Sequence, residues 1–166
     1  MKLLIKRTLL LFLTFLMSLP FFLLTGCDYN ENSSTNDLDK VGEFHTAVVQ
    51  SQEYLDEIAD DIYRYWYDAI YEDKYGGNIT LAVYYAKQAN AENLEAVETN
   101  EANIRELYKE VRDSELSTKI KAVMSAYTDY YEFVVNVSGS FQTYKNGKET
   151  YKKALASALK DLALEL

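Results

Sequence analysis

The sequence predicts an all-α protein, an antiparallel bundle of about four helices. The only proline is Pro20, so the rest of the chain lacks the residue that most strongly interrupts helices. Glycines are few and occur in small groups. Apolar residues recur at alternating spacings of three and four along most of the chain. Together these three observations indicate long amphipathic helices with few breaks.

A first long helix is predicted over residues 41–75. Positions that would face a core recur every three or four residues, the pattern of a helix that buries one face. These positions are Phe44, Val48, Ser51, Leu55, Ile58, Ile62, Tyr65 and Ala69. Trp66 and Ile70 are expected to widen the buried stripe. The helix should stop at Gly76 and Gly77, because glycine readily adopts the left-handed conformation that ends helices.

A second helix is predicted from Asn78 or Thr80, either of which can cap its start, to residues 113–114. Residues 87–93 contain only alanines as apolar residues. A kink is therefore expected in this stretch, and a break near residues 99–100 is the alternative. A third helix is predicted over residues 115–137, where apolar side chains again follow helical spacing.

A loop or irregular hook is predicted over residues 138–147. In it, Gly139 is expected to make the turn and Phe141 to close the end of the bundle. A fourth helix is predicted from Lys148. Its buried positions follow helical spacing and are Tyr151, Leu155, Ala158 and Leu162. Short connections between the four helices favour antiparallel neighbours.

The distribution of charge favours pairing of the first and last helices. Nine acids accompany two bases from Glu43 to Lys74, whereas residues 145–160 hold five lysines and one acid.

The N-terminus has the pattern of an export signal. Lysine and arginine side chains precede an apolar run from Leu9 to Leu24, which leads into Leu24-Thr25-Gly26-Cys27. These four residues resemble the lipobox of bacterial lipoproteins. The resemblance implies that Cys27 receives a diacylglyceryl group and becomes the first residue after cleavage. Leu24, Thr25 and Gly26 would form the recognition sequence, and the protein would be anchored on the extracytoplasmic face of the cell membrane.

Two other interpretations of this segment stay open. The apolar run is near the lower length limit for a helix that spans a bilayer, so it could be an uncleaved anchor. Alternatively, Cys27 could be an ordinary residue that follows a conventional signal peptide. As the only cysteine, Cys27 has no disulfide partner within the chain. The predicted domains are a signal peptide (1–26), the lipidated cysteine with a polar flexible tether (27–40) and a helical bundle (41–166).

The composition argues against nucleic acid as a partner. Without residues 1–26 the chain has 14 Lys plus Arg and 26 Asp plus Glu, a formal charge of −12. Nucleic-acid binding depends on neutralising phosphates with lysine and arginine. An anionic lipid surface would also repel this body on average, although a local basic patch would behave differently.

Tyrosine is unusually frequent, with 15 residues in the chain. At 100° per residue, Tyr63, Tyr67 and Tyr71 run from the edge of the first helix's core face toward its outside. A neighbouring helix could cover them, or they could lie half-buried with their hydroxyls in water. Tyrosines on a surface also favour interfaces with proteins or sugars. These three residues are the candidate binding surface.

We expect no catalytic site, no cofactor and no metal. His45 is the only histidine and lies near the start of the first helix. Asp56 with Asp60, and Glu57 with Asp61, form carboxylate pairs one helical turn apart that could serve as cation ligands or as an acid and base. A two-carboxylate centre in a bundle would also need Glu-x-x-His motifs on other helices, and the sequence has none.

The stretch Trp66–Tyr71 and the stretch Ser138–Tyr144 are similar to segments of small helical proteins from Gram-positive bacteria and their mobile elements. The resemblance implies a helical fold and a protein that faces outward, and it supplies no catalytic residues. Asp28, directly after Cys27, resembles the inner-membrane retention signal of hosts with two membranes.

The expected function is a membrane-anchored protein-interaction or binding module, of the kind that provides exclusion or immunity. The alternative is a small-ligand or glycan binder with a tyrosine-lined groove.

Overall fold

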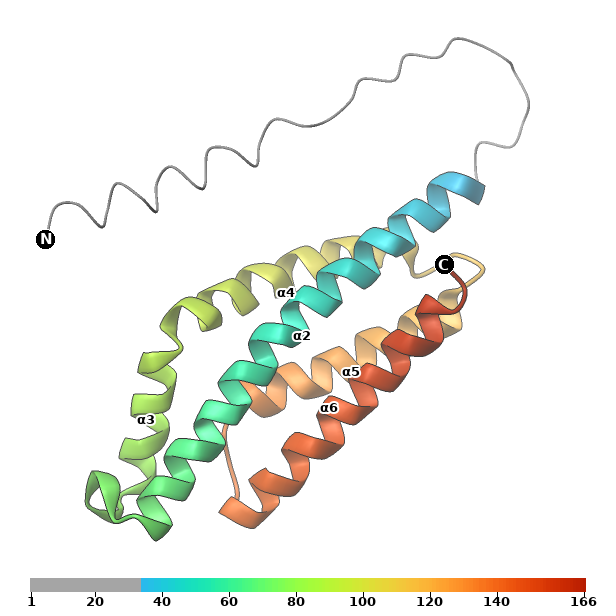
Figure 1. Cartoon of the computed structure of the whole chain (residues 1–166). Helices are drawn as coiled ribbons and strands as arrows, with labels where there is room; N and C mark the ends of the chain where they lie inside the picture. The colour runs from blue at the N-terminus through green and yellow to red at the C-terminus, as the bar shows by residue number, and fades with distance from the viewer. Residues whose placement is uncertain (1–33) are drawn as a thin grey trace, which may run out of the picture. The chain divides into compact units, whose positions relative to one another are not determined.

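The computed structural model describes residues 34–166 as an all-α domain of five helices and one short 3-10 turn, without strands in that range (Figure 1). The elements are α2 (Ser34–Tyr71), the 3-10 turn (Lys74–Gly77), α3 (Ile79–Ala89), α4 (Ala91–Val111), α5 (Ser117–Val135) and α6 (Phe141–Ala163). The predicted signal peptide and the lipobox residues through Cys27 lie outside the described residues.

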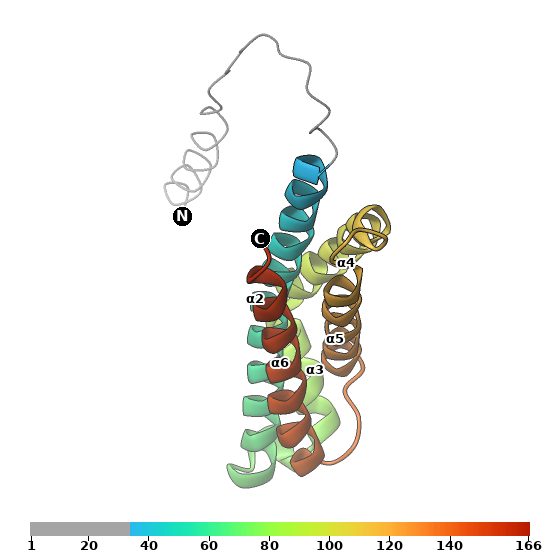
Figure 2. The ribbon, with the colours of Figure 1, turned by 90° about the vertical axis from the view of Figure 1, so that its right-hand side faces the viewer.

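The five helices form four arms, because α3 and α4 together make one bent arm (Figures 1 and 2). Successive arms run in opposite directions, as the short connections predicted. Helix α2 packs mainly against α4 and α3, and α5 packs mainly against α6. Helix α2 also contacts α5 and α6, so it lies at the centre of the domain.

The predicted seam of α2 is confirmed. All of its positions are buried except Tyr65, which is half-buried, and Val41, Ala59 and Trp66 add to the core. Ile70 is 41% exposed, so the prediction that it widens the stripe is wrong. Helix α2 spans 38 residues, about 57 Å at 1.5 Å per residue.

Helix α2 begins at Ser34, so residues 34–40 of the predicted flexible tether are helical and that part of the prediction is wrong. Two features account for the earlier start. Val41 is buried at 1% exposure, which extends the seam one turn ahead of Phe44. Asp37 lies in the first turn, where the helix dipole stabilises a carboxylate.

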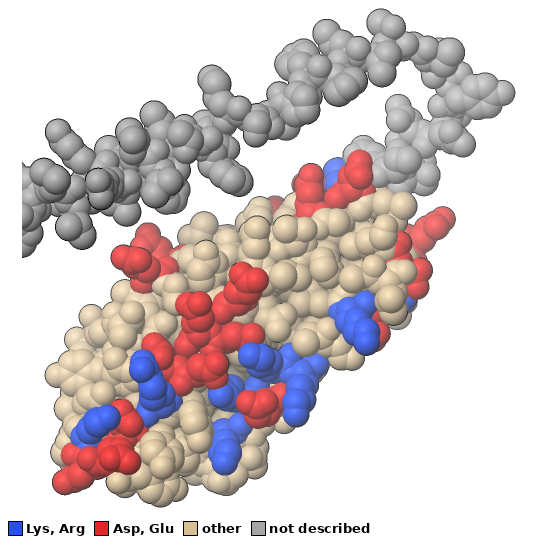
Figure 3. Space-filling model, in the orientation of Figure 1, with Lys and Arg blue, Asp and Glu red and all other residues tan. Residues whose placement is uncertain are grey.

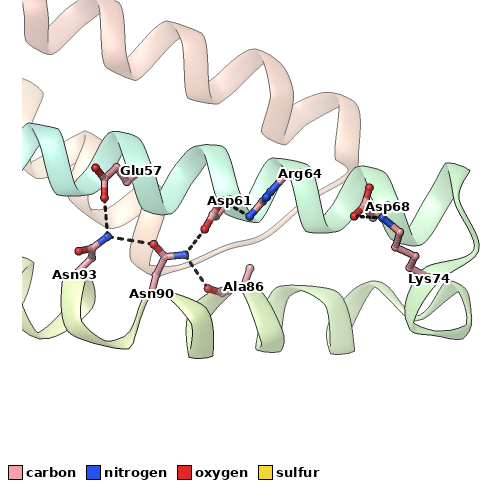
Figure 4. A network of polar contacts seen from close by, with 8 residues as sticks. All are labelled: Glu57, Asp61, Arg64, Asp68, Lys74, Ala86, Asn90 and Asn93. Carbon is pink, nitrogen blue, oxygen red and sulfur yellow. Dashed lines mark hydrogen bonds and ion pairs between the residues drawn. The ribbon is translucent and has the colours of Figure 1, made fainter. Parts of the chain in front are cut away.

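The kink expected within residues 87–93 is confirmed at Asn90, which separates α3 from α4. The side chain of Asn90 donates to the carbonyl oxygen of Ala86 at 3.0 Å and to Asp61 Oδ2 on α2 at 2.8 Å (Figure 4). The side-chain amide therefore adds a second donor to the Ala86 carbonyl, which also accepts from the Asn90 backbone N–H, and it ties the bend to α2. The alternative break near residues 99–100 is wrong, because α4 continues through them.

Helix α6 begins at Phe141, so the predicted loop over 138–147 is wrong from residue 141 onward. Ser140 caps the helix by accepting a hydrogen bond from the Thr143 amide at 3.2 Å. Gly139 makes the turn with a φ of 89°, as predicted. Gly147 lies inside α6, where its lack of a side chain leaves room for the Phe133 ring. A Cβ atom at Gly147 would lie 2.6 Å from Phe133 Cε2.

The predicted pairing of the acidic and basic stripes is confirmed. Lys148 of α6 forms an ion pair with Asp60 of α2, and Lys152 pairs with Asp56 at 2.9 Å. Acidic and basic side chains lie beside one another on the face shown in Figure 3. These contacts lie between long helices, so they help to decide which helix lies next to which.

Candidate functional site

Large hydrophobic side chains are exposed mainly at one end of the bundle. Of the eleven that are exposed in the described part of the chain, seven lie between Tyr67 and Tyr85. They are Tyr67, Ile70, Tyr71, Ile79, Leu81, Tyr84 and Tyr85. This end holds the last turns of α2, the 3-10 turn and the first turns of α3, and it lies opposite the start of α2 (Figure 1). We call these seven residues the aromatic end.

The predicted surface of Tyr63, Tyr67 and Tyr71 forms one side of this end. Tyr71 and Tyr67 are 61% and 41% exposed, whereas Tyr63 is half-buried. Neighbouring rings of this series lie 6.5 and 4.6 Å apart between centroids. Phe141, at the start of α6, stacks on Tyr63 at 5.1 Å and contacts the other two rings. Phe141 therefore covers part of the row at the bundle end, and the outer two tyrosines stay exposed.

A second aromatic row lies on the α3 side of the same end. Tyr75, from the 3-10 turn, stacks on Tyr65 of α2 with centroids 5.6 Å apart, and it lies 5.7 Å from Tyr85 of α3. Tyr84 extends the row beyond Tyr85 at 5.5 Å. Burial against these neighbours raises the pKa of the Tyr75 phenol. Three separate elements thus contribute rings to one surface.

The backbone that carries Tyr75 is strained. Tyr75 and Asp73 have φ angles of 59° and 51°, and they are the only non-glycine residues with positive φ in the described part. Gly76 and Gly77 continue the left-handed path at 60° and 68°. This conformation costs a residue with a side chain about 1–2 kcal/mol. It also turns the Tyr75 ring back onto Tyr65.

The second row lines an open depression of about 440 Å³. Its walls are Tyr65, Tyr75, Tyr85, Gln88 and Ala89. The lining is mainly aromatic carbon, with the Gln88 amide as a polar group that can donate and accept hydrogen bonds. Such a surface can stack on flat or weakly polar groups of a partner.

The carboxylates that were candidates for chemistry have structural partners. Asp56 and Asp60 pair with lysines of α6, and Glu57 accepts from Asn93 at 2.9 Å (Figure 4). Asp61 accepts from Asn90 and from Arg64. The arrangement separates these acids into contacts with different helices. Between residues 34 and 166, no group of three or more His, Cys, Asp or Glu side chains is placed to hold a metal ion.

His45 lies half-buried near the start of α2, far along the helix from the aromatic end. The strongest pKa shifts belong to phenols of the core. Burial raises the pKa of Tyr127 to about 12, and burial raises the pKa of Tyr130 and Tyr144 above the usual range. All three phenols lie inside the bundle, where they join helices. None contributes to the aromatic end.

The predicted binding surface does not include Tyr84 and Tyr85 of the aromatic end, nor Tyr75 beside them. One signal was available, since adjacent residues such as Tyr84 and Tyr85 point about 100° apart on a helix and cannot both face a narrow core. The role of Tyr75 had no sequence signal, because the pattern gives no reason for a tyrosine to adopt a left-handed conformation.

None of the helices between residues 34 and 166 contains an apolar stretch long enough to cross a bilayer. Comparison of the chain with protein-family models, curated protein sequences and solved structures finds no match.

Proposed function

We propose that this chain is an exported lipoprotein, anchored through Cys27, that presents its aromatic end to another protein at the cell surface. The observation that carries the proposal is the concentration of exposed tyrosine and aliphatic side chains at the end of the bundle opposite the start of α2. Cys27 precedes that start by seven residues. An anchor at Cys27 would therefore leave the aromatic end free, about 57 Å along α2.

The chemistry of the aromatic end supports a protein partner. Tyrosine is enriched at protein interfaces because its ring buries a large area while its hydroxyl forms hydrogen bonds. Tyr71 and Tyr84 are the two most exposed tyrosines of this surface, and they lie on α2 and α3 respectively. A partner that covered both helices would bury the ring surface that the described part of the chain leaves exposed.

The test is site-specific photo-crosslinking in living cells. A photoreactive phenylalanine analogue replaces Tyr71 or Tyr84 in the full chain, and the control position is Thr118, an exposed residue at the start of α5. We expect one discrete protein adduct from both aromatic positions and none from position 118. Adducts of equal yield at all three positions, or adducts at none, would contradict a protein partner at this end.

A second candidate is a carbohydrate ligand, favoured by the open depression beside Tyr65, Tyr75 and Gln88. Sugar rings bind aromatic faces through their C–H groups, and an amide can hydrogen-bond their hydroxyls. Binding of labelled cell-wall glycan fragments that is lost in Tyr85→Ala and Gln88→Ala, together with a lack of protein adducts, would favour this candidate.

A further inference from the structure

The charge of the described surface is unevenly distributed, and one groove departs from the general acidity. This groove, of about 490 Å³, lies between α4 and α5. Four cations and one carboxylate line it: Arg105, Lys109, Arg112, Lys121 and Asp129. Four other depressions of the surface have no lysine or arginine in their linings, and three of them contain two or more acids. The groove is therefore a local basic site on an acidic protein.

The helix faces explain why these cations gather. Arg105, Lys109 and Arg112 recur at spacings of four and three, so they project from one face of α4. Lys121, Ser125 and Thr128 follow the same spacing on α5. Helices α4 and α5 contact each other at few points, because α4 packs on α2 and α5 packs on α6. The seam between them stays open, and the long basic side chains surround it.

Apart from Arg105, the cations of the groove form only exposed ion pairs, or none, within the described residues. Arg105 contacts Glu101 through Nε, and Arg112 contacts Asp113 through Nε at 3.4 Å. Neither guanidinium group has a second ion-pair partner within the described residues. Lys109 pairs with Glu106 at 2.7 Å, and both side chains are more than half exposed. Lys121 has no ion pair in the same range. The pairs of Lys109 and Arg112 are exposed and contribute little, so an anion that contacts several cations can compete with them.

The groove also has neutral donors and an apolar residue in its lining. Tyr108 and Ser125, whose side chains carry hydroxyl groups, line it together with Met124, which is 8% exposed. Guanidinium groups bind phosphate oxygens in pairs, and ammonium and hydroxyl groups add further donors. We propose that this groove is a binding site for a phosphate-bearing small molecule or headgroup. The site is independent of the aromatic end, which lies on the opposite part of the domain.

Phosphate could reach the groove from two sources, a lipid headgroup or a soluble phosphate ester. The ion pair of Lys40 with Glu110, 2.8 Å long, places the end of α4 beside the start of α2. If Cys27 is lipidated, the groove lies at the membrane-proximal end of the domain, where anionic headgroups are available. This geometry favours the lipid source, and the experiment separates the two sources.

The experiment is an NMR titration of the full chain in uncharged detergent micelles at constant ionic strength. The soluble probes are inorganic phosphate and glycerol 3-phosphate. The lipid probe is phosphatidylglycerol added to the micelles. Phosphatidylcholine is its control, because a choline cation balances its phosphate and leaves no net charge. Saturable shifts of the Tyr108, Ser125 and Thr128 resonances with any phosphate probe support the site. Saturation by the soluble probes identifies a soluble ligand, and saturation by phosphatidylglycerol alone identifies a headgroup.

Two double variants distinguish a site from general electrostatic attraction. Arg112→Gln with Lys121→Gln removes two cations from the groove, whereas Lys145→Gln with Lys153→Gln removes two exposed cations of α6 outside it. We expect the groove variant to weaken binding at least about tenfold, as for the loss of a charge-assisted contact, and the α6 variant less than about twofold. Equal weakening by both variants, or no saturable response to any phosphate probe, would overturn the proposal. So would saturable binding of an oligoglutamate peptide in the groove without any response to phosphate.

Discussion

The hydroxyl of Tyr130 donates a hydrogen bond of 2.7 Å to Oδ1 of Asp56, in a partly buried contact between α5 and α2. The other carboxylate oxygen of Asp56 pairs with Lys152 of α6 at 2.9 Å. One carboxylate therefore joins three helices. It fixes their relative register in a core whose other contacts are mainly apolar and less directional.

Removal of this hydroxyl tests its contribution to stability. We expect Tyr130→Phe to lower the free energy of unfolding by about 1.5–3 kcal/mol, the usual value for a hydrogen bond to a charged group. Urea denaturation of the full chain measures the change. Tyr131→Phe is the control, because the Tyr131 hydroxyl forms no hydrogen bond within residues 34–166. Equal stability of the two variants would show that the Asp56 contact contributes nothing net.

The buried phenols predict a loss of stability at alkaline pH. Burial raises the pKa of Tyr127 from 10.0 to about 12, since the ionised phenolate is poorly solvated in the core. A raised pKa means that the folded state holds the proton more tightly than the unfolded state. The contribution of the Tyr127 phenol to the free energy of unfolding is thus fully present below pH 10, and it is lost as the pH rises from 10 to about 12. We expect Tyr127→Phe to reduce the slope of stability against pH in this range. An unchanged slope would contradict the assignment.

Substitution by alanine is expected to have opposite effects on stability at Gly147 and at Gly42. At Gly147 a methyl group would meet the Phe133 ring, which is held between Tyr144 and Tyr151 at 4.8 and 4.9 Å. Gly147→Ala should therefore destabilise the domain by about 1–3 kcal/mol. At Gly42 no atom lies within 4 Å of the added carbon. Gly42→Ala should stabilise the domain by about 0.5–1 kcal/mol, the ordinary helix preference for alanine. Thermal unfolding of both variants checks the pair, and stabilisation by both would contradict the close packing at Gly147.

Removal of the buried Asn90 amide is expected to destabilise the domain. Its side chain is 5% exposed and donates to both Ala86 and Asp61. We expect Asn90→Ala to lower the free energy of unfolding by about 1–3 kcal/mol, because the change removes the hydrogen bond to the charged Asp61 of α2 together with the side-chain bond to the Ala86 carbonyl. Asn93→Ala is the control, because it removes an exposed contact with Glu57 and a 3.2 Å bond to Asn90 Oδ1 but leaves both hydrogen bonds that Asn90 donates in place. If Asn93→Ala were the more damaging change, the bend would not depend on Asn90.

The sequence predicted those parts of the fold that follow from periodicity within one helix. The α2 seam was predictable in this way. The kink near Asn90 was predicted from a stretch whose only apolar residues are alanines, and the pairing of α2 with α6 from the opposite charges of the two segments. The start of α6 was not, because Gly147 resembles a loop residue until Phe133 is known to lie beside it. Local pattern carries no information on a contact made by a residue fourteen positions earlier in the chain.

The candidate sites were less predictable than the fold. Tyr67 and Tyr71 were predicted from their helical angle, which depends on α2 alone. The row of Tyr65, Tyr75 and Tyr85 requires three elements and a left-handed backbone at Tyr75, and neither is encoded in residue spacing. The basic groove likewise depends on how far α4 and α5 separate. Each of these features arises from packing between helices.

Lipidation of Cys27 is the central claim, because it decides which end of the domain faces away from the membrane. The most direct test is mass spectrometry of the membrane fraction from cells that express the wild-type chain or Cys27→Ala. We predict a mature N-terminal peptide that begins at a diacylated Cys27, and its loss in the variant. An intact Met1, or an unmodified Cys27 thiol in the membrane-bound protein, would contradict the anchor.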